Sequence, residues 1–219
     1  MGWIRRCIKE PFPGLSHLFG ALLSVAGLVV LLVRAEGRVW HVVSFAVYGT
    51  CLILVYVASA LTHSVHCSPE TGHRLDRFDY AAIFLMIAGT YTPLCLVPLR
   101  GPWGWGLLAG IWSMAAFGIA SLFLWPPRSR ARLRTVLYVC MGWLAVLAMG
   151  EILRTFPPAA LGWLVAGGVV YSLGAVVFVT DRPNLWPGRF VAHDLWHVMV
   201  LVGSACHFVV MLDFVAPHA

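Results

Sequence analysis

Charged residues are scarce in this 219-residue chain, where Asp, Glu, Lys and Arg together make up 11% of the sequence. Soluble domains carry roughly a quarter charged residues, and about half of their residues are apolar. Here 60% of the residues are hydrophobic, which excludes an ordinary soluble fold. The length suits about seven spans of roughly 20 residues each, and no separate soluble domain is expected beside them.

The sequence also lacks paired cysteines and a basic stripe. Its six cysteines show no C-x-x-C spacing, and four of them fall inside apolar runs, so neither a disulfide framework nor a thiolate zinc site is expected. The net charge is +6, but the fifteen Lys and Arg residues stand between the apolar runs. This distribution is typical of membrane topology signals, and it argues against a nucleic-acid partner.

Long apolar runs fill most of the chain and predict an all-α integral membrane protein, with residues 1–219 forming one seven-helix transmembrane domain. The first run follows Arg5, Arg6 and Lys9 and resembles a signal peptide. Its length, and the six similar runs that follow it, favour an uncleaved span. Only Pro93 falls well inside a span, where a kink is expected. The expected spans cover residues 15–34, 41–63, 79–98, 103–125, 134–154, 160–180 and 192–214.

The Lys and Arg residues are distributed unevenly between the two ends of these spans. With a cytoplasmic N-terminus, eleven of them lie on the cytoplasmic side and four lie on the opposite side. Positive charge accumulates on the cytoplasmic side of membrane proteins. We therefore expect the N-terminus inside and the C-terminus outside, which requires an odd number of spans.

Three histidines are expected to meet at the cytoplasmic end. His193 and His197 stand at i and i+4, so both imidazoles project from one helix face, about 6 Å apart along the axis. His63 ends the second expected span at the same depth. Three imidazoles leave one tetrahedral position open, as in catalytic zinc sites, although the ligand types alone also suit other borderline metals. Two histidines at this spacing with no third ligand, in contrast, can simply lie at the membrane interface or form hydrogen bonds.

Asp79 and Ser59 are candidate catalytic residues beside this metal set. Asp79 opens the third expected span and could accept a proton from a zinc-bound water, or else form a surface ion pair with Arg77. Ser59 lies one turn deeper than His63 on the same helix face. Its hydroxyl either packs between helices or hydrogen-bonds to Asp79 or to the water.

Two other histidines need separate interpretations. His17 lies near the start of the first span and follows Glu10, and for this pair a cap or an ion pair is as plausible as a role in the site. His207 lies ten residues beyond His197, about 15 Å along a helix, and cannot share its metal.

An ordered set of short motifs runs along nearly the whole chain. It comprises Glu10 with Ser16-His17, Ser59-x-x-x-His63, Asp79 leading into Ile87-Ala88-Gly89-Thr90-Tyr91-Thr92-Pro93, Tyr138-x-x-Met141-Gly142-Trp143, Gly167-Gly168-x-x-Tyr171-Ser172-x-Gly174, and His193-x-x-x-His197 with Gly203-Ser204-x-x-His207-Phe208. This set resembles the hemolysin III-like branch of the progestin and adipoQ receptor superfamily, which is related to the alkaline ceramidases.

The resemblance implies seven helices and a cytoplasmic-side zinc ion on the histidines that match His63, His193 and His197. It also implies that Ser59 and Asp79 are site residues. Thr62 departs from the pattern, because an aromatic residue often precedes the metal histidine in the family, and this change alters the pocket wall while leaving the ligand assignment intact.

The leading hypothesis is a zinc-dependent intramembrane hydrolase that acts on a lipid-like amide or ester in the plasma membrane of a bacterium. The alternative is a lipid-binding receptor or regulatory membrane protein whose zinc is structural. A pore, which the hemolysin label implies, is less favoured because the polar residues gather at one end instead of lining a path. A haem protein is also conceivable from the histidines.

Overall fold

The computed structural model describes residues 7–125 and 127–218, with the backbone alone for residues 127–132. Within these ranges, seven helical segments are long and apolar enough to cross a membrane, which confirms the expected count. The seven segments are Pro11–Arg34 (α2), Val39–Ser64 (α3), Pro69–Leu96 (α4), Pro102–Leu124 (α5), Leu133–Thr155, Pro158–Thr180 (α8) and Ala192–Val215, the last formed by α9 (Ala192–Val210) and the π-helical turn η2 (Met211–Val215).

Local capping starts α4 earlier than the apolar pattern predicts. The third span was expected from residue 79, whereas α4 begins at Pro69. The Ser68 hydroxyl accepts a hydrogen bond from the Thr71 N–H at 3.3 Å, and Pro69 occupies a first-turn position that needs no N–H donor. These polar first turns carry no apolar signal, and as a result Asp79 lies well inside α4 and not at its start.

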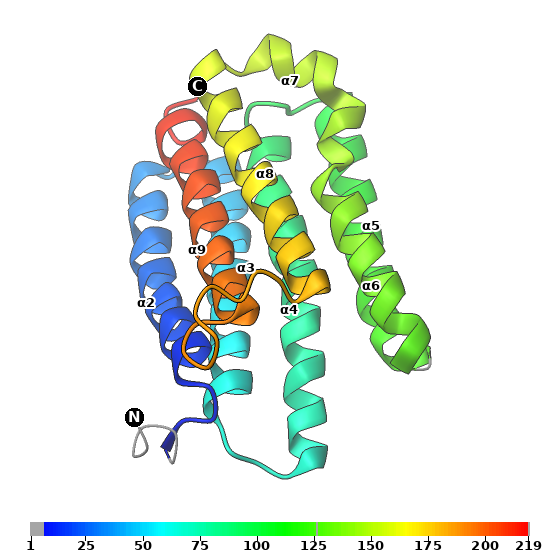
Figure 1. The fold of residues 1–219 in the computed structure, drawn as a ribbon. Helices are drawn as coiled ribbons and strands as arrows, with labels where there is room; N and C mark the ends of the chain where they lie inside the picture. The colour runs from blue at the N-terminus through cyan, green and yellow to red at the C-terminus, as the bar shows by residue number, and fades with distance from the viewer. Residues whose placement is uncertain (1–6, 126, 219) are drawn as a thin grey trace.

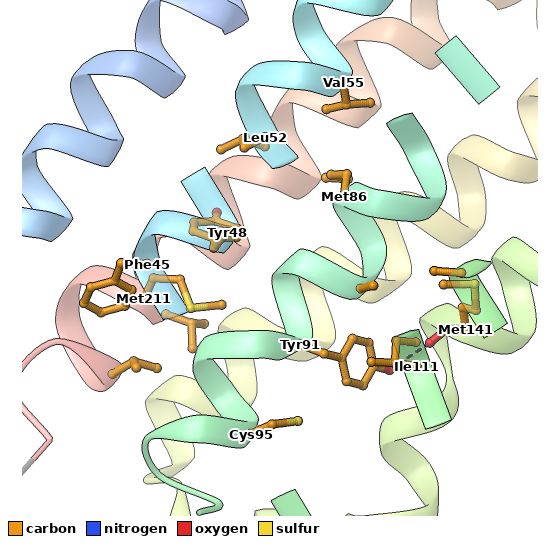
Figure 2. Packing of buried hydrophobic residues seen from close by; sticks show 14 of the residues in the cluster. Phe45, Tyr48, Leu52, Val55, Met86, Tyr91, Cys95, Ile111, Met141 and Met211 are labelled. Carbon is orange, nitrogen blue, oxygen red and sulfur yellow. Dashed lines mark hydrogen bonds between the residues drawn. The ribbon is translucent and has the colours of Figure 1, made fainter. Parts of the chain in front are cut away.

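The fifth span is broken and not continuous as expected. It consists of α6 (Pro127–Gly142), a 3-10 segment η1 (Leu144–Ala148) and the short helix α7 (Met149–Thr155). Tyr91 of α4 lies at the break, where its hydroxyl donates to the Met141 carbonyl at 2.9 Å (Figure 2). The same hydroxyl accepts from the Ala145 N–H at 3.0 Å. An unpaired backbone group is costly inside a membrane, so this side chain stabilises the interruption.

The helices form a ring in which neighbours in sequence are mostly neighbours in space (Figure 1). Helix α2 packs against both α3 and α9, which closes the ring between its first and last members. On the other side the ring continues through α4, α5 and α6, and α6 contacts α8. The start of α2, the end of α3 and the start of α9 therefore lie together at one end of the bundle.

A glycine allows α2 to approach its two partners closely. A Cβ atom at Gly20 would lie 2.8 Å from a methyl carbon of Leu201 on α9 and 2.9 Å from the ring of Tyr56 on α3. Small residues at such positions let membrane helices pack closely. The core of the bundle is apolar and includes Leu52 and Met86 (Figure 2). Many Leu, Val and Phe side chains on the outer surface are exposed, as expected in lipid.

The orientation relative to the cytoplasm stays a prediction. The C-terminal end of η2 and the start of α2 lie at opposite ends of the bundle (Figure 1), as an odd number of spans requires. Arg5 and Arg6, which contribute to the charge count, lie outside the described residues.

Candidate metal centre

Three imidazoles form a compact triangle at the end of the bundle where α2 begins. His63 comes from the last turn of α3, and His193 and His197 come from the first two turns of α9. One ring nitrogen from each residue lies within 4.8 Å of the other two. The ring centroids are 4.7–5.1 Å apart, so the three rings contact one another. Helices distant in sequence thus supply one potential metal-binding group.

The start of α9 is held in place by two polar side chains. Asp194 reaches back to accept a hydrogen bond from the Val191 N–H at 2.9 Å, and Asn184 accepts from the Ala192 N–H at 2.9 Å. Both contacts satisfy N–H groups that the first helical turn leaves without partners, and the carboxylate suits the positive end of the helix dipole. This capping places His193 in the first turn, with its imidazole toward the bundle.

Glu10 contacts the imidazole of His63 through its carboxylate. The Nδ1 atom of His63 donates a hydrogen bond of 2.6 Å to the Glu10 carboxylate, and this bond holds the pKa of Glu10 below its usual value. The same two residues are joined through the backbone, because the Glu10 N–H donates to the His63 carbonyl at 2.8 Å. With Nδ1 engaged, Nε2 of His63 is the nitrogen left for a metal.

His17 contacts His197 in a similar way. Its ring lies on the inner face of α2, and the Nδ1 atom of His197 is 3.2 Å from Nδ1 and 3.0 Å from Nε2 of His17. Nε2 of His17 also donates to the His197 backbone carbonyl at 3.4 Å. Both side chains are buried, at 3% and 2% exposure, so the hydrogen bonds between them replace contacts with water.

The two candidate catalytic residues come from α3, which carries His63, and from the neighbouring helix α4. Ser59 is buried one turn deeper on α3. Asp79 of α4 is half-buried and lies within electrostatic range of His63 and of Arg134. Asp79 is not one of the residues whose ligand atoms could share one metal ion. It is a neighbour of the site.

The donor set fits zinc. The Nε2 atoms of His193 and His197 lie 3.1 Å apart, and two nitrogens of a tetrahedral zinc site with Zn–N bonds of about 2.0–2.1 Å lie roughly 3.3 Å apart. Neutral imidazole is a ligand that zinc favours, although copper, nickel and iron accept it too. Three ligands leave one tetrahedral position for a water or a substrate atom.

The sequence brought together His63, His193 and His197, and for Glu10 and His17 it left open whether they form a cap or an ion pair or take part in the site. Both residues stand in the opening motif, which was a signal of their importance. Their partners are 53 and 180 residues away in the chain, and only the packing of α2 between α3 and α9 shows the contact. His207 is not part of this group, as expected, and its Nδ1 donates to the Gly203 carbonyl at 2.8 Å.

Comparisons with known proteins agree with this fold. Residues 5–208 match the family described as "Haemolysin-III related". The chain is 39% identical to "Hemolysin-3" of Bacillus cereus over 215 residues, which cover 97% of this chain and 94% of the relative. It is 33% identical to "Heptahelical transmembrane protein ADIPOR2" of Oryza sativa subsp. japonica over 180 residues, 73% of this chain and 75% of the relative.

A human relative is more distant. "Monocyte to macrophage differentiation factor" of Homo sapiens is 26% identical over 206 residues, which cover 92% of this chain and 82% of the relative. These relatives support the hemolysin III-like branch of the wider receptor superfamily. The seven apolar helices and the Bacillus relatives support an integral multi-pass protein of a bacterial plasma membrane.

Proposed function

This chain belongs to the haemolysin-III-related family, and from that membership and its histidine centre we propose that it is a zinc-dependent hydrolase acting within the membrane. The substrate class is a lipid-like molecule with an amide or ester bond. The observation that carries the proposal is the convergence of His63, His193 and His197 with ring nitrogens within 4.8 Å of one another. Three such ligands are typical of catalytic zinc sites, which keep one position open.

The surrounding residues supply the remaining chemistry. A zinc ion held by the three histidines would contribute Lewis-acid chemistry at a substrate carbonyl. Asp79, within electrostatic range of His63, would accept the proton of the attacking water and return it to the leaving group. The buried Ser59 hydroxyl would orient Asp79 or donate a hydrogen bond to the developing oxyanion.

The environment of the site favours a lipid substrate. The centre lies at one end of a bundle whose outer surface carries exposed side chains such as Leu22, Phe123 and Val179. An amphipathic molecule with its polar group at the membrane surface and its chain in the bilayer could therefore present a scissile bond near His193. Membrane lipids are accordingly the partners that we propose.

The test is turnover of defined lipids by purified, zinc-loaded protein. Synthetic N-acyl amides and acyl esters are incubated with wild type, Asp79→Asn and Ser59→Ala, and Asp213→Asn serves as the control because Asp213 is exposed in η2 at the other end of the bundle. We expect products from wild type and from the control, with a loss of about 10²–10⁴-fold in Asp79→Asn if it acts as the general base. Equal turnover in Asp79→Asn, with zinc retained, would reject Asp79 as the base.

A second candidate function is a lipid-binding receptor or regulatory protein with a structural zinc. The observation that favours it is that His63 and the His193–His197 pair come from different helices, so a metal between them would hold α3 and α9 together. Metal binding of this kind contributes to folding stability. This alternative holds if chelation collapses the fold while incubated lipids give no new products.

A further inference from the structure

We infer that Glu10 and His17 are positioning residues of the metal centre, each fixing one ligand histidine so that its Nε2 atom faces the metal. The inference rests on the proposed function only in requiring that a metal binds, and not in requiring that a lipid is cleaved. It makes the first membrane helix and the residue before it part of the site.

The contact between Glu10 and His63 determines which nitrogen of the ring can bind a metal. In the 2.6 Å bond the carboxylate accepts and Nδ1 donates, so the hydrogen of the neutral ring sits on Nδ1 and the lone pair sits on Nε2. A carboxylate in this position also makes the imidazole a more basic ligand.

The N-terminal segment stays attached to α3 without the Glu10 side chain. Two backbone bonds already join this segment to the end of α3, from the Lys9 N–H to the Ser64 carbonyl at 3.3 Å and from the Glu10 N–H to the His63 carbonyl at 2.8 Å. The ion pair of Glu10 with Lys9 is long, at 3.8 Å, and both side chains are substantially exposed, so it contributes little. The carboxylate instead directs its short contact to His63.

The contact between His17 and His197 has the same consequence for the second ligand. When His197 binds a metal through Nε2, its Nδ1 carries the hydrogen and can donate to Nδ1 of His17 at 3.2 Å. Nε2 of His17 then carries a hydrogen and donates to the His197 carbonyl at 3.4 Å. This assignment of hydrogens pairs these two contacts, whereas the 3.0 Å approach of Nδ1 of His197 to Nε2 of His17 then joins two N–H groups and is not a hydrogen bond. The ring of Tyr56 packs edge-on against His17 at 5.0 Å.

The two contacts use the Nδ1 atoms of His63 and His197 and leave their Nε2 atoms for a metal. Nε2 of His197 already points at Nε2 of His193, 3.1 Å away, and the ring of His63 lies against both of theirs. Fixed ligand orientation lowers the cost of assembling the site, and loss of such a partner typically weakens metal binding by about 10–100-fold.

The experiment measures zinc affinity of the detergent-purified full chain by competition with a chromophoric chelator. Glu10→Gln keeps the shape and an acceptor oxygen while removing the charge, and His17→Leu removes both ring nitrogens. His17→Asn returns an acceptor near the position of Nδ1. Glu70→Gln is the control, because Glu70 loses the same charge but is exposed in the first turn of α4.

We expect Glu10→Gln and His17→Leu to bind zinc about 10–100-fold more weakly than wild type, with partial recovery in His17→Asn and no change in Glu70→Gln. The melting temperature without metal should be unchanged in Glu10→Gln, since its backbone bonds remain, and only the increase produced by zinc should shrink. Wild-type affinity in both Glu10→Gln and His17→Leu overturns the inference while leaving the hydrolase proposal standing. A wild-type protein that binds no zinc overturns both, whereas zinc binding without any lipid turnover leaves the inference intact.

Discussion

The Nε2 atoms of His193 and His197 face each other at 3.1 Å across one turn of α9. A helix brings residues four apart onto one face, but the ring planes must also rotate toward a common point for this distance to arise. His17 holds His197 in that rotation, and Asp194 holds the turn that carries His193. The pair is therefore arranged by its surroundings as well as by its spacing.

Zinc binding should weaken as the pH falls. An imidazole nitrogen binds a metal only in the neutral ring, so protons compete with zinc for His63, His193 and His197. Affinity is highest on the alkaline side and falls with each unit of acidification once the rings begin to take up protons. Competition titrations between pH 8 and pH 5 check this, and an affinity that stays constant across that range would contradict a histidine-based site.

Tyr91→Phe should destabilise the broken fifth span. The substitution leaves the Met141 carbonyl and the Ala145 N–H without the hydroxyl that now pairs with both, and we expect a loss of about 1–3 kcal/mol in the free energy of unfolding. Tyr48→Phe is the matched control, since the buried Tyr48 hydroxyl has no hydrogen-bond partner among the described residues. Thermal unfolding in detergent measures both variants, and equal melting temperatures would contradict the role given to Tyr91.

Gly20→Leu should weaken zinc binding from a distance. The new side chain would collide with Tyr56 and Leu201, push α2 away from α3 and α9, and separate His17 from His197. Gly106→Leu places the same residue in open space on α5 and should leave the affinity unchanged. The chelator competition assay compares the two, and identical affinities would show that α2 packing does not support the site.

The sequence predicted the helices well where a long apolar run is the whole signal. It failed at α4, whose start depends on the Ser68 cap, and at the fifth span, whose break depends on a hydrogen bond from Tyr91. The hydropathy pattern marks neither of them, although Ser68 followed by Pro69 is a local signal for the start of a helix. The convergence of His63, His193 and His197 was predictable because the depth of each residue follows from the span that carries it.

The surroundings of the ligands were not predictable in the same way. The contacts of Glu10 with His63 and of His17 with His197 join residues that are far apart in the chain. They depend on the closure of the helix ring between α2 and α9, and hydropathy and charge do not encode which helices are neighbours.

The central claim is that His63, His193 and His197 bind one zinc ion, and metal analysis of the purified chain tests it most directly. Wild type is measured beside His63→Ala and His193→Ala, with His66→Ala as control because His66 is exposed in the connection after α3. We predict about one zinc per chain in wild type and in the control, and loss of the metal in the two ligand variants. A wild type without metal, or full zinc content in His63→Ala and His193→Ala, would contradict the account.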